Sequence, residues 1–136
     1  MLYPATLPNL DLLWTDKRPD VMEAKLRALL EPARLSGIQS YYLQVMTQIA
    51  RAQALQGKII EASSTLDEVE ADLCERVSAA HIRYYLERGR IQLLQNHAEP
   101  AKKFFQKASR MAEAAHLINC TKDVVKLFVT EQRIAS

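Results

Sequence analysis

The spacing of apolar residues along the chain predicts an all-α protein. After residue 19, apolar side chains return every three or four positions, which is the period of a helix with one buried stripe. Ala, Leu, Gln, Glu, Lys and Arg fill most of residues 20–133, and these residues favour helix over sheet. About six helices are therefore expected, over residues 20–37, 40–56, 58–74, 75–95, 98–115 and 121–133.

Capping and breaking residues support these boundaries. Asp20 is placed to cap the first helix, and Pro32 should bend its end. Gly37 and Gly57 stand where the first and second helices stop, as expected of glycines that adopt a left-handed conformation. The connections are only a few residues long, so consecutive helices should pack as antiparallel hairpins.

The apolar stripes predict which residues of each helix are buried. For the second and fourth expected helices these are Leu43, Met46, Ile49, Ala50 and Leu55, and Ile82, Tyr85, Leu86, Ile91 and Leu94. Residues 1–19, with prolines at 4, 8 and 19, are expected to form an irregular lead-in. Its apolar residues should lie on the first helix, and they are Leu10, Leu12, Leu13 and Trp14.

The sequence repeats itself with an offset of 39 residues. The stretch "LQGKIIEA" from Leu55 recurs as "LQNHAEPA" from Leu94. Asn96 takes the place of Gly57, and it is expected to adopt the same left-handed conformation, which asparagine tolerates. The same offset superposes Arg51 on Arg90, Gln53 on Gln92, Ala62 on Ala101, Leu66 on Phe105 and Val69 on Ala108. A two-helix repeat with a period of 20 to 50 residues is typical of an α-solenoid, in which each hairpin buries its stripe against the next.

The order of small and large residues in the two copies resembles the tetratricopeptide repeat family. The matching series are Ala50, Gly57, Ile59, Ala62, Leu66, Val69 and Gly89, Asn96, Ala98, Ala101, Phe105, Ala108. Closely crossing helices need small side chains at the contact and large ones beside it. Gly89 lies in mid-helix, where glycine costs about 1 kcal/mol relative to alanine, so close approach of a neighbouring helix is expected there.

This resemblance implies a tetratricopeptide-like repeat domain over residues 20–136. It would contain a half repeat at 20–37, repeats at 40–74 and 76–115, and a terminal helix at 121–133. The match departs from the family in its longer period, since the family repeats every 34 residues. Arg88 also stands where the family has leucine, and Gln53 and Gln92 stand where it has an aromatic residue. A plain helical bundle with an accidental internal match is the alternative.

Size and charge restrict the possible functions. The 136 residues fit one domain, and 49% hydrophobic with 25% charged residues is typical of a soluble globular protein. A net charge of +2 is too balanced to indicate a nucleic-acid or membrane partner. The first residues have no basic leader and no long apolar run, so a cytoplasmic location is expected. Cys74 and Cys120 have no CxxC spacing, so neither a disulfide nor a metal is expected.

Enzyme chemistry is not expected. The sequence contains no nucleotide-binding glycine motif and none of the HExxH, GxSxG or CxxC patterns, so no catalytic residue, cofactor or metal is predicted. The acidic run "LDEVEADLCE" has the layout of a solvated helix face. The basic strip on the fifth helix, Lys102, Lys103, Lys107 and Arg110, is interpreted in the same way, and a ligand-sensing or DNA-associated regulator using this strip is the alternative function.

The resemblance implies a protein-protein interaction module. In tetratricopeptide proteins the first helix of each repeat faces a concave groove that takes a peptide or helix from a partner. By position, this groove would be lined by Gln44, Gln48, Arg51, Arg83, Glu87 and Arg90. The superposed Arg51 and Arg90 could grip carboxylates, so an acidic or C-terminal peptide is the expected ligand. The lysine and asparagine clamp of the chaperone-binding subfamily is missing, since Thr47 and Arg51 occupy two of its places.

The last expected helix predicts a second contact surface. Val125, Phe128 and Val129 lie on one apolar stripe, and the chain ends before a helix that would cover them. Solenoid ends normally carry polar caps. An apolar last helix therefore predicts self-association or docking on another protein.

Overall fold

The computed structural model describes residues 7–14, 18–74 and 78–114, and all regular structure in these ranges is helical. The all-α prediction is therefore confirmed for the described part of the chain. The elements are the short 3-10 helix η1 (Leu10–Leu12) and α1 (Pro19–Ala28), α2 (Leu30–Leu35), α3 (Gln39–Leu55), α4 (Ile59–Asp72), α5 (Ala79–Leu94) and α6 (Ala98–Ala114). The expected terminal helix at 121–133, with Val125, Phe128 and Val129, lies outside the described residues.

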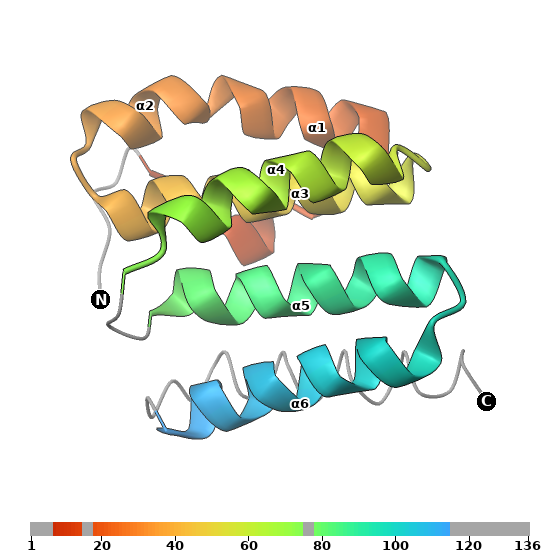
Figure 1. Cartoon of the computed structure of the whole chain (residues 1–136). Coiled ribbons are helices and arrows are strands. Elements are labelled where there is room, and N and C mark those ends of the chain that lie inside the picture. Colours follow the sequence, from red (N-terminus) through yellow and green to blue (C-terminus); the bar gives the residue numbers. More distant parts are fainter. Residues whose placement is uncertain (1–6, 15–17, 75–77, 115–136) are drawn as a thin grey trace.

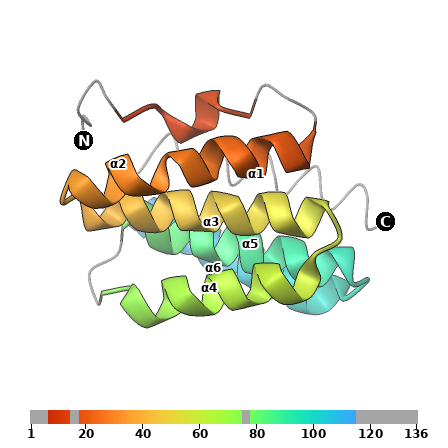
Figure 2. The same cartoon turned by 90° about the horizontal axis from the view of Figure 1, so that it is seen from above.

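Helix α3 is the centre of the packing. It contacts α1 and α2 on one side and α4 and α5 on others, while α5 packs in turn against α6 (Figure 1). Seen from above, η1 and α4 lie on opposite sides of α3 (Figure 2). Eleven of the seventeen residues of α3 are buried, and they include the polar residues Gln44, Thr47, Gln48 and Gln53. A helix buried on most sides has to satisfy such polar groups with specific partners.

The two turns that carry the repeated sequence have the same geometry. Gly57 and Asn96 both adopt the left-handed conformation, with φ of 81° and 63°. The N–H of Gly57 donates to the carbonyl of Ala54 at 2.9 Å, and the N–H of Lys58 donates to that of Gln53 at 3.0 Å. The equivalent bonds 39 residues later run from Asn96 to Leu93 (3.0 Å) and from His97 to Gln92 (2.8 Å). These are the paired bonds of the Schellman motif, so the predicted conformation at both turns is confirmed.

Close approach at Gly89 is also confirmed. A Cβ atom built on Gly89 would lie 2.5 Å from Cε1 of Phe105 and 2.8 Å from its Cδ1. Phe105 is 2% exposed and lies in a core cluster between α5 and α6. In the first copy the corresponding residues are Ala50 and Leu66, which share another buried cluster. The glycine of the second copy therefore makes room for a ring that is larger than leucine.

The first helical region differs from the prediction. Instead of one helix from Asp20, the chain forms α1 and α2 with a break at Leu29, because Pro32 has no N–H to donate to the carbonyl of Ala28. Arg18 occupies the N-cap position and Asp20 lies in the first turn, so the predicted Asp20 cap was wrong. The order Arg18-Pro19-Asp20 explains this, since proline is favoured at the first helical position and the helix starts there.

Two leucines predicted to be buried are exposed. Leu55 and Leu94 are 41% and 48% exposed, and they occupy the last positions of α3 and α5. Each lies just before the left-handed turn, where the chain reverses and no facing helix covers the side chain. The fourth expected helix also begins later than predicted, at Ala79.

The residues that depart from the tetratricopeptide pattern have local polar partners. Oε1 of Gln53 accepts a hydrogen bond from the Thr65 hydroxyl at 2.7 Å, which links α3 to α4. Arg88 donates to the Tyr84 hydroxyl at 2.9 Å and pairs with Asp67 at 2.5 Å, which links α5 to α4. At these positions α4 is therefore joined to α3 and α5 by polar contacts, where leucine or an aromatic residue would supply apolar packing.

Candidate functional site

The six predicted groove residues lie on two neighbouring helices. Gln44, Gln48 and Arg51 come from α3, and Arg83, Glu87 and Arg90 come from α5 at positions 39 residues later. One of the three equivalent pairs is in direct contact, since Nε of Arg83 donates to Oε1 of Gln44 at 2.9 Å. Helices α3 and α5 pack against each other (Figure 1). We call the surface formed by these six residues the α3–α5 face.

The equivalent arginines Arg51 and Arg90 are close enough to interact electrostatically. Burial lowers the pKa of the Arg51 guanidinium from its ordinary value, and the positive charge of Arg90 lowers it further, while Glu87 acts in the opposite direction. The carboxylate of Glu87 is engaged locally, because its Oε2 accepts from Nε of Arg90 at 2.9 Å. Both members of that ion pair are more than 90% buried. Arg90 is therefore buried in an ion pair within α5 and is not exposed to bind a ligand.

Arg51 is the least compensated cation of the α3–α5 face. Its Nε is buried and has no hydrogen-bond partner among the residues that the structure describes. The guanidinium instead lies over the indole ring of Trp14, with 4.1 Å between its central carbon and the ring centroid. Such a cation–π contact supplies attraction without using the N–H donors. Arg51 thus keeps donor capacity that a carboxylate would match.

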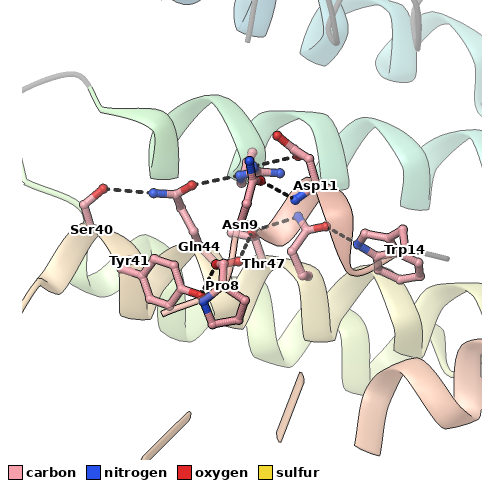
Figure 3. Close-up of polar contacts among 10 residues, drawn as sticks. Pro8, Asn9, Asp11, Trp14, Ser40, Tyr41, Gln44 and Thr47 are labelled. Carbon is pink, nitrogen blue, oxygen red and sulfur yellow. Dashed lines mark hydrogen bonds and ion pairs between the residues drawn. The ribbon is translucent and has the colours of Figure 1, made fainter. Parts of the chain in front are cut away.

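Residues 7–14, which we call the N-terminal segment, lie on the α3–α5 face. The Tyr41 hydroxyl donates to the carbonyl of Pro8 at 2.5 Å, and Trp14 Nε1 donates to Oε1 of Gln48 at 2.8 Å. The segment therefore runs along α3 in the same direction as the helix (Figure 3). Between these ends, the carboxylate of Asp11 pairs with the terminal nitrogen of Arg83 at 2.8 Å.

This position of the N-terminal segment was not predicted. The sequence suggested that its apolar residues lie on the first helix, and Leu7 and Leu10 do enter a cluster with Met22 and Leu26 of α1. Its polar contacts, however, go to α3 and α5. Asp11 and Arg83 are 72 residues apart, so no local pattern could pair them. The sequence did contain one indication. The lead-in has an acidic residue and a tryptophan three positions apart, and Gln44, Gln48 and Arg51 share one side of a helix and can bind such side chains.

A row of polar side chains on α3 holds the face in place. Gln44 donates to the Ser40 hydroxyl at 3.3 Å, and Gln48 donates to the Thr47 hydroxyl at 3.3 Å. Thr47 itself donates to the carbonyl of Gln44 at 2.6 Å. The amide oxygen of Gln44 accepts from Arg83, and the amide oxygen of Gln48 accepts from Trp14. The amide oxygens of Gln44 and Gln48 are thus held in fixed positions beside the guanidiniums of Arg83 and Arg51.

Other candidate groups are placed apart from this face. The basic residues Lys102, Lys103, Lys107 and Arg110 are exposed on α6, where Lys107 Nζ lies 4.5 Å from the centroid of the Tyr85 ring. The acidic residues Asp67 and Glu70 of α4 are exposed, and they pair with Arg88 of α5.

Histidines and acidic residues form no metal site within the described ranges. There, no group of three or more His, Cys, Asp or Glu side chains is placed to hold a metal ion. His81 is buried at the start of α5, where its ring nitrogens lie 2.7 Å from the carbonyl of Cys74 and 3.1 Å from the Ser78 hydroxyl. Of the helices in the described residues, none has the length and apolar character needed to cross a membrane.

Comparison with known proteins adds no relative. A scan against models of protein families, a search of curated proteins and a search of solved structures each found no match. The residues of the α3–α5 face and their contacts are therefore the basis for a function.

Proposed function

We propose that this chain is a non-enzymatic, tetratricopeptide-like interaction module whose α3–α5 face binds a short acidic segment of a partner protein. Two features support the repeat interpretation. The Schellman turns at Gly57 and Asn96 recur with the 39-residue period, and the helices before them, α3 and α5, pack side by side. In a solenoid of helix hairpins, such neighbouring first helices line the surface used for binding.

The charge of the face carries the proposal. The six residues of the α3–α5 face include three arginines, Arg51, Arg83 and Arg90, and one carboxylate, Glu87. Arg90 is neutralised by Glu87 within α5, which leaves Arg51 and Arg83 without a carboxylate from either helix. The decisive observation is the buried Nε of Arg51, which has no hydrogen-bond partner among the described residues. An acidic segment would supply a carboxylate to Arg51 and would take the place of Asp11 on Arg83.

The polar row on α3 favours a polypeptide ligand over a small anion. The Tyr41 hydroxyl already binds a backbone carbonyl, and the Gln48 amide already binds an indole N–H. A peptide can supply a backbone carbonyl, an aromatic side chain and a carboxylate together, whereas a small anion supplies only the negative charge. Glutamine and arginine donors and acceptors fixed along one helix are suited to read such a segment at successive positions.

A peptide array tests the proposal. Random octamers would be probed with the wild-type chain and with Trp14→Ala. The variant is included because loss of Trp14 weakens the attachment of the N-terminal segment, which covers the α3–α5 face in the wild type. We expect Asp and Glu to be enriched among the bound peptides, and the enrichment to disappear in Arg51→Ala and Arg83→Ala. Absence of acidic enrichment with both chains, or its persistence in the arginine variants, would contradict the proposal.

Arg90 is not a suitable position for this test. Its removal would leave the Glu87 carboxylate buried without its ion-pair partner, which commonly costs about 3–5 kcal/mol. A loss of binding in Arg90→Ala would then report unfolding. Lys103→Ala on the exposed surface of α6 is a matched control, because it removes one positive charge far from α3 in the fold.

A further inference from the structure

The N-terminal segment is itself a short peptide held on the α3–α5 face. It contributes two buried leucines, Leu7 and Leu10, which are 6% and 3% exposed. Leu12, by contrast, is 72% exposed and contacts solvent. The segment is thus anchored at defined positions and open at others, as a bound peptide is.

Each anchoring position matches one chemical feature of the face. The carbonyl of Pro8 accepts from Tyr41, and the carboxylate of Asp11 accepts from Arg83. Three residues later, the indole of Trp14 both donates to Gln48 and lies under Arg51. The Asn9 side chain accepts from the N–H of Asp11 at 2.9 Å, which starts the single helical turn that brings Asp11 and Trp14 to the same side.

The segment neutralises only part of the face. Asp11 supplies one carboxylate, and it pairs with Arg83. Arg51 receives the Trp14 ring and no carboxylate, so the face still carries an excess of positive charge when the segment is in place. An external segment with a further acidic residue near its aromatic position would make a contact with Arg51 that the internal segment does not make.

We infer that the N-terminal segment is an internal competitor for the α3–α5 face, and that the partner, under the proposed function, carries the same pattern of leucine, acidic residue and, three positions after the acid, an aromatic residue. Two segments with this chemistry cannot occupy Arg83, Gln48 and Arg51 at once. Partner binding therefore requires the N-terminal segment to leave. Because the segment is covalently attached, it acts at a high effective concentration and sets the threshold for an external peptide.

Fluorescence anisotropy with a labelled synthetic peptide of residues 7–14 tests this inference on the full chain. The double variant Asp11→Ala/Trp14→Ala weakens the internal segment and leaves α3 and α5 intact. We expect it to bind the peptide at least tenfold more tightly than the wild type or Leu12→Ala, the exposed-position control. Adding Arg83→Ala to the double variant should reverse most of the gain, and a peptide with alanine at both the acidic and the aromatic position should not bind.

The outcomes separate this inference from the proposed function. Equal affinity of the wild type and the double variant would overturn the competitor role while peptide binding itself remained. If acidic array peptides bind but the peptide of residues 7–14 binds no variant, the proposed partner pattern is wrong. If no acidic peptide binds any folded variant, both proposals fail. Circular dichroism establishes folding, and the single variant Asp11→Asn repeats the comparison with a smaller perturbation.

Discussion

The guanidinium of Arg51 lies 4.1 Å above the ring of Trp14, and the same indole donates a hydrogen bond to Gln48. This one side chain therefore connects the N-terminal segment to two of the predicted face residues. It also covers the only Nε atom of the described arginines that is buried without a hydrogen-bond partner. The stability of the segment on the face should depend strongly on this contact.

Replacing Trp14 with alanine should lower the free energy of unfolding by about 2–3 kcal/mol. The change removes a cation–π contact worth about 0.5–2 kcal/mol and leaves the buried Oε1 of Gln48 without its donor. Urea unfolding measures the effect. Leu12→Ala is the control and should change stability by no more than about 0.5 kcal/mol, because Leu12 is exposed. Equal effects of the two variants would show that the segment is not held through its tryptophan.

The ion pair between Asp11 and Arg83 should show measurable coupling. Arg83 is 16% exposed in its side chain and Asp11 48%, so the pair is only partly screened by water. A double-mutant cycle with Asp11→Ala and Arg83→Ala should give about 0.5–1 kcal/mol. The exposed pair of Glu31 and Arg34, with side chains 64% and 61% exposed, should give a smaller value and serves as the reference. Coupling no larger than this reference would place Asp11 in solvent.

The two turns and the glycine of α5 show how much of the fold could be predicted from sequence. Gly57 and Asn96 were identifiable because a left-handed residue is chemically restricted, and their identical hydrogen bonds confirm the prediction. Gly89 was identifiable because glycine inside a helix needs a reason, and Phe105 is that reason. These are local features, and the residue type alone carries the information.

Tertiary features could be predicted only in part. The 39-residue offset relates Gln44 to Arg83, and the structure brings these two side chains into contact. It could not indicate that Glu87 would pair with Arg90, since either residue could have faced outwards. The docking of Asp11 on Arg83 depends on a contact across 72 residues, for which the sequence contains no periodic signal.

Gly89→Ala should destabilise the protein, although alanine is the better helix former by about 1 kcal/mol. The added Cβ would overlap the Phe105 ring at 2.5 Å, and overpacking of a core commonly costs about 1–3 kcal/mol. Adding Phe105→Leu should recover part of the loss, because the first copy of the repeat combines Ala50 with Leu66. Thermal unfolding of the single and double variants measures this. A higher melting temperature for Gly89→Ala alone would mean that the helices α5 and α6 are less close.

Tyr84 should titrate at a higher pH than is ordinary for a tyrosine. Burial raises the pKa of Tyr84 to about 12, and its hydrogen bond to Glu70 acts in the same direction, while Arg88 opposes it. The folded state thus holds the phenolic proton more tightly than the unfolded chain, where tyrosine titrates near pH 10. The stabilisation from neutral Tyr84 is complete below about pH 10 and is lost as the pH rises towards 12.

Tyrosinate absorbance measures this titration directly. Subtracting the curve of Tyr84→Phe from that of the wild type isolates the one transition, whose midpoint should lie near pH 12. The stability difference between wild type and Tyr84→Phe should also decrease over the same pH range. A midpoint near pH 10 in the difference curve would show that the hydroxyl is solvated and does not link α5 to α4.

Fluorescence of Trp14 tests the central claim most directly, because it is the only tryptophan in the chain. The wild-type protein would be titrated with an unlabelled peptide of residues 7–14 that has phenylalanine at the tryptophan position, and with the same peptide carrying lysine in place of aspartate. We predict a saturable red shift of the emission with the first peptide, as Trp14 leaves Arg51 for water, and no shift with the second. An emission maximum that stays constant with both peptides would contradict an α3–α5 face that exchanges its own segment for an acidic partner segment.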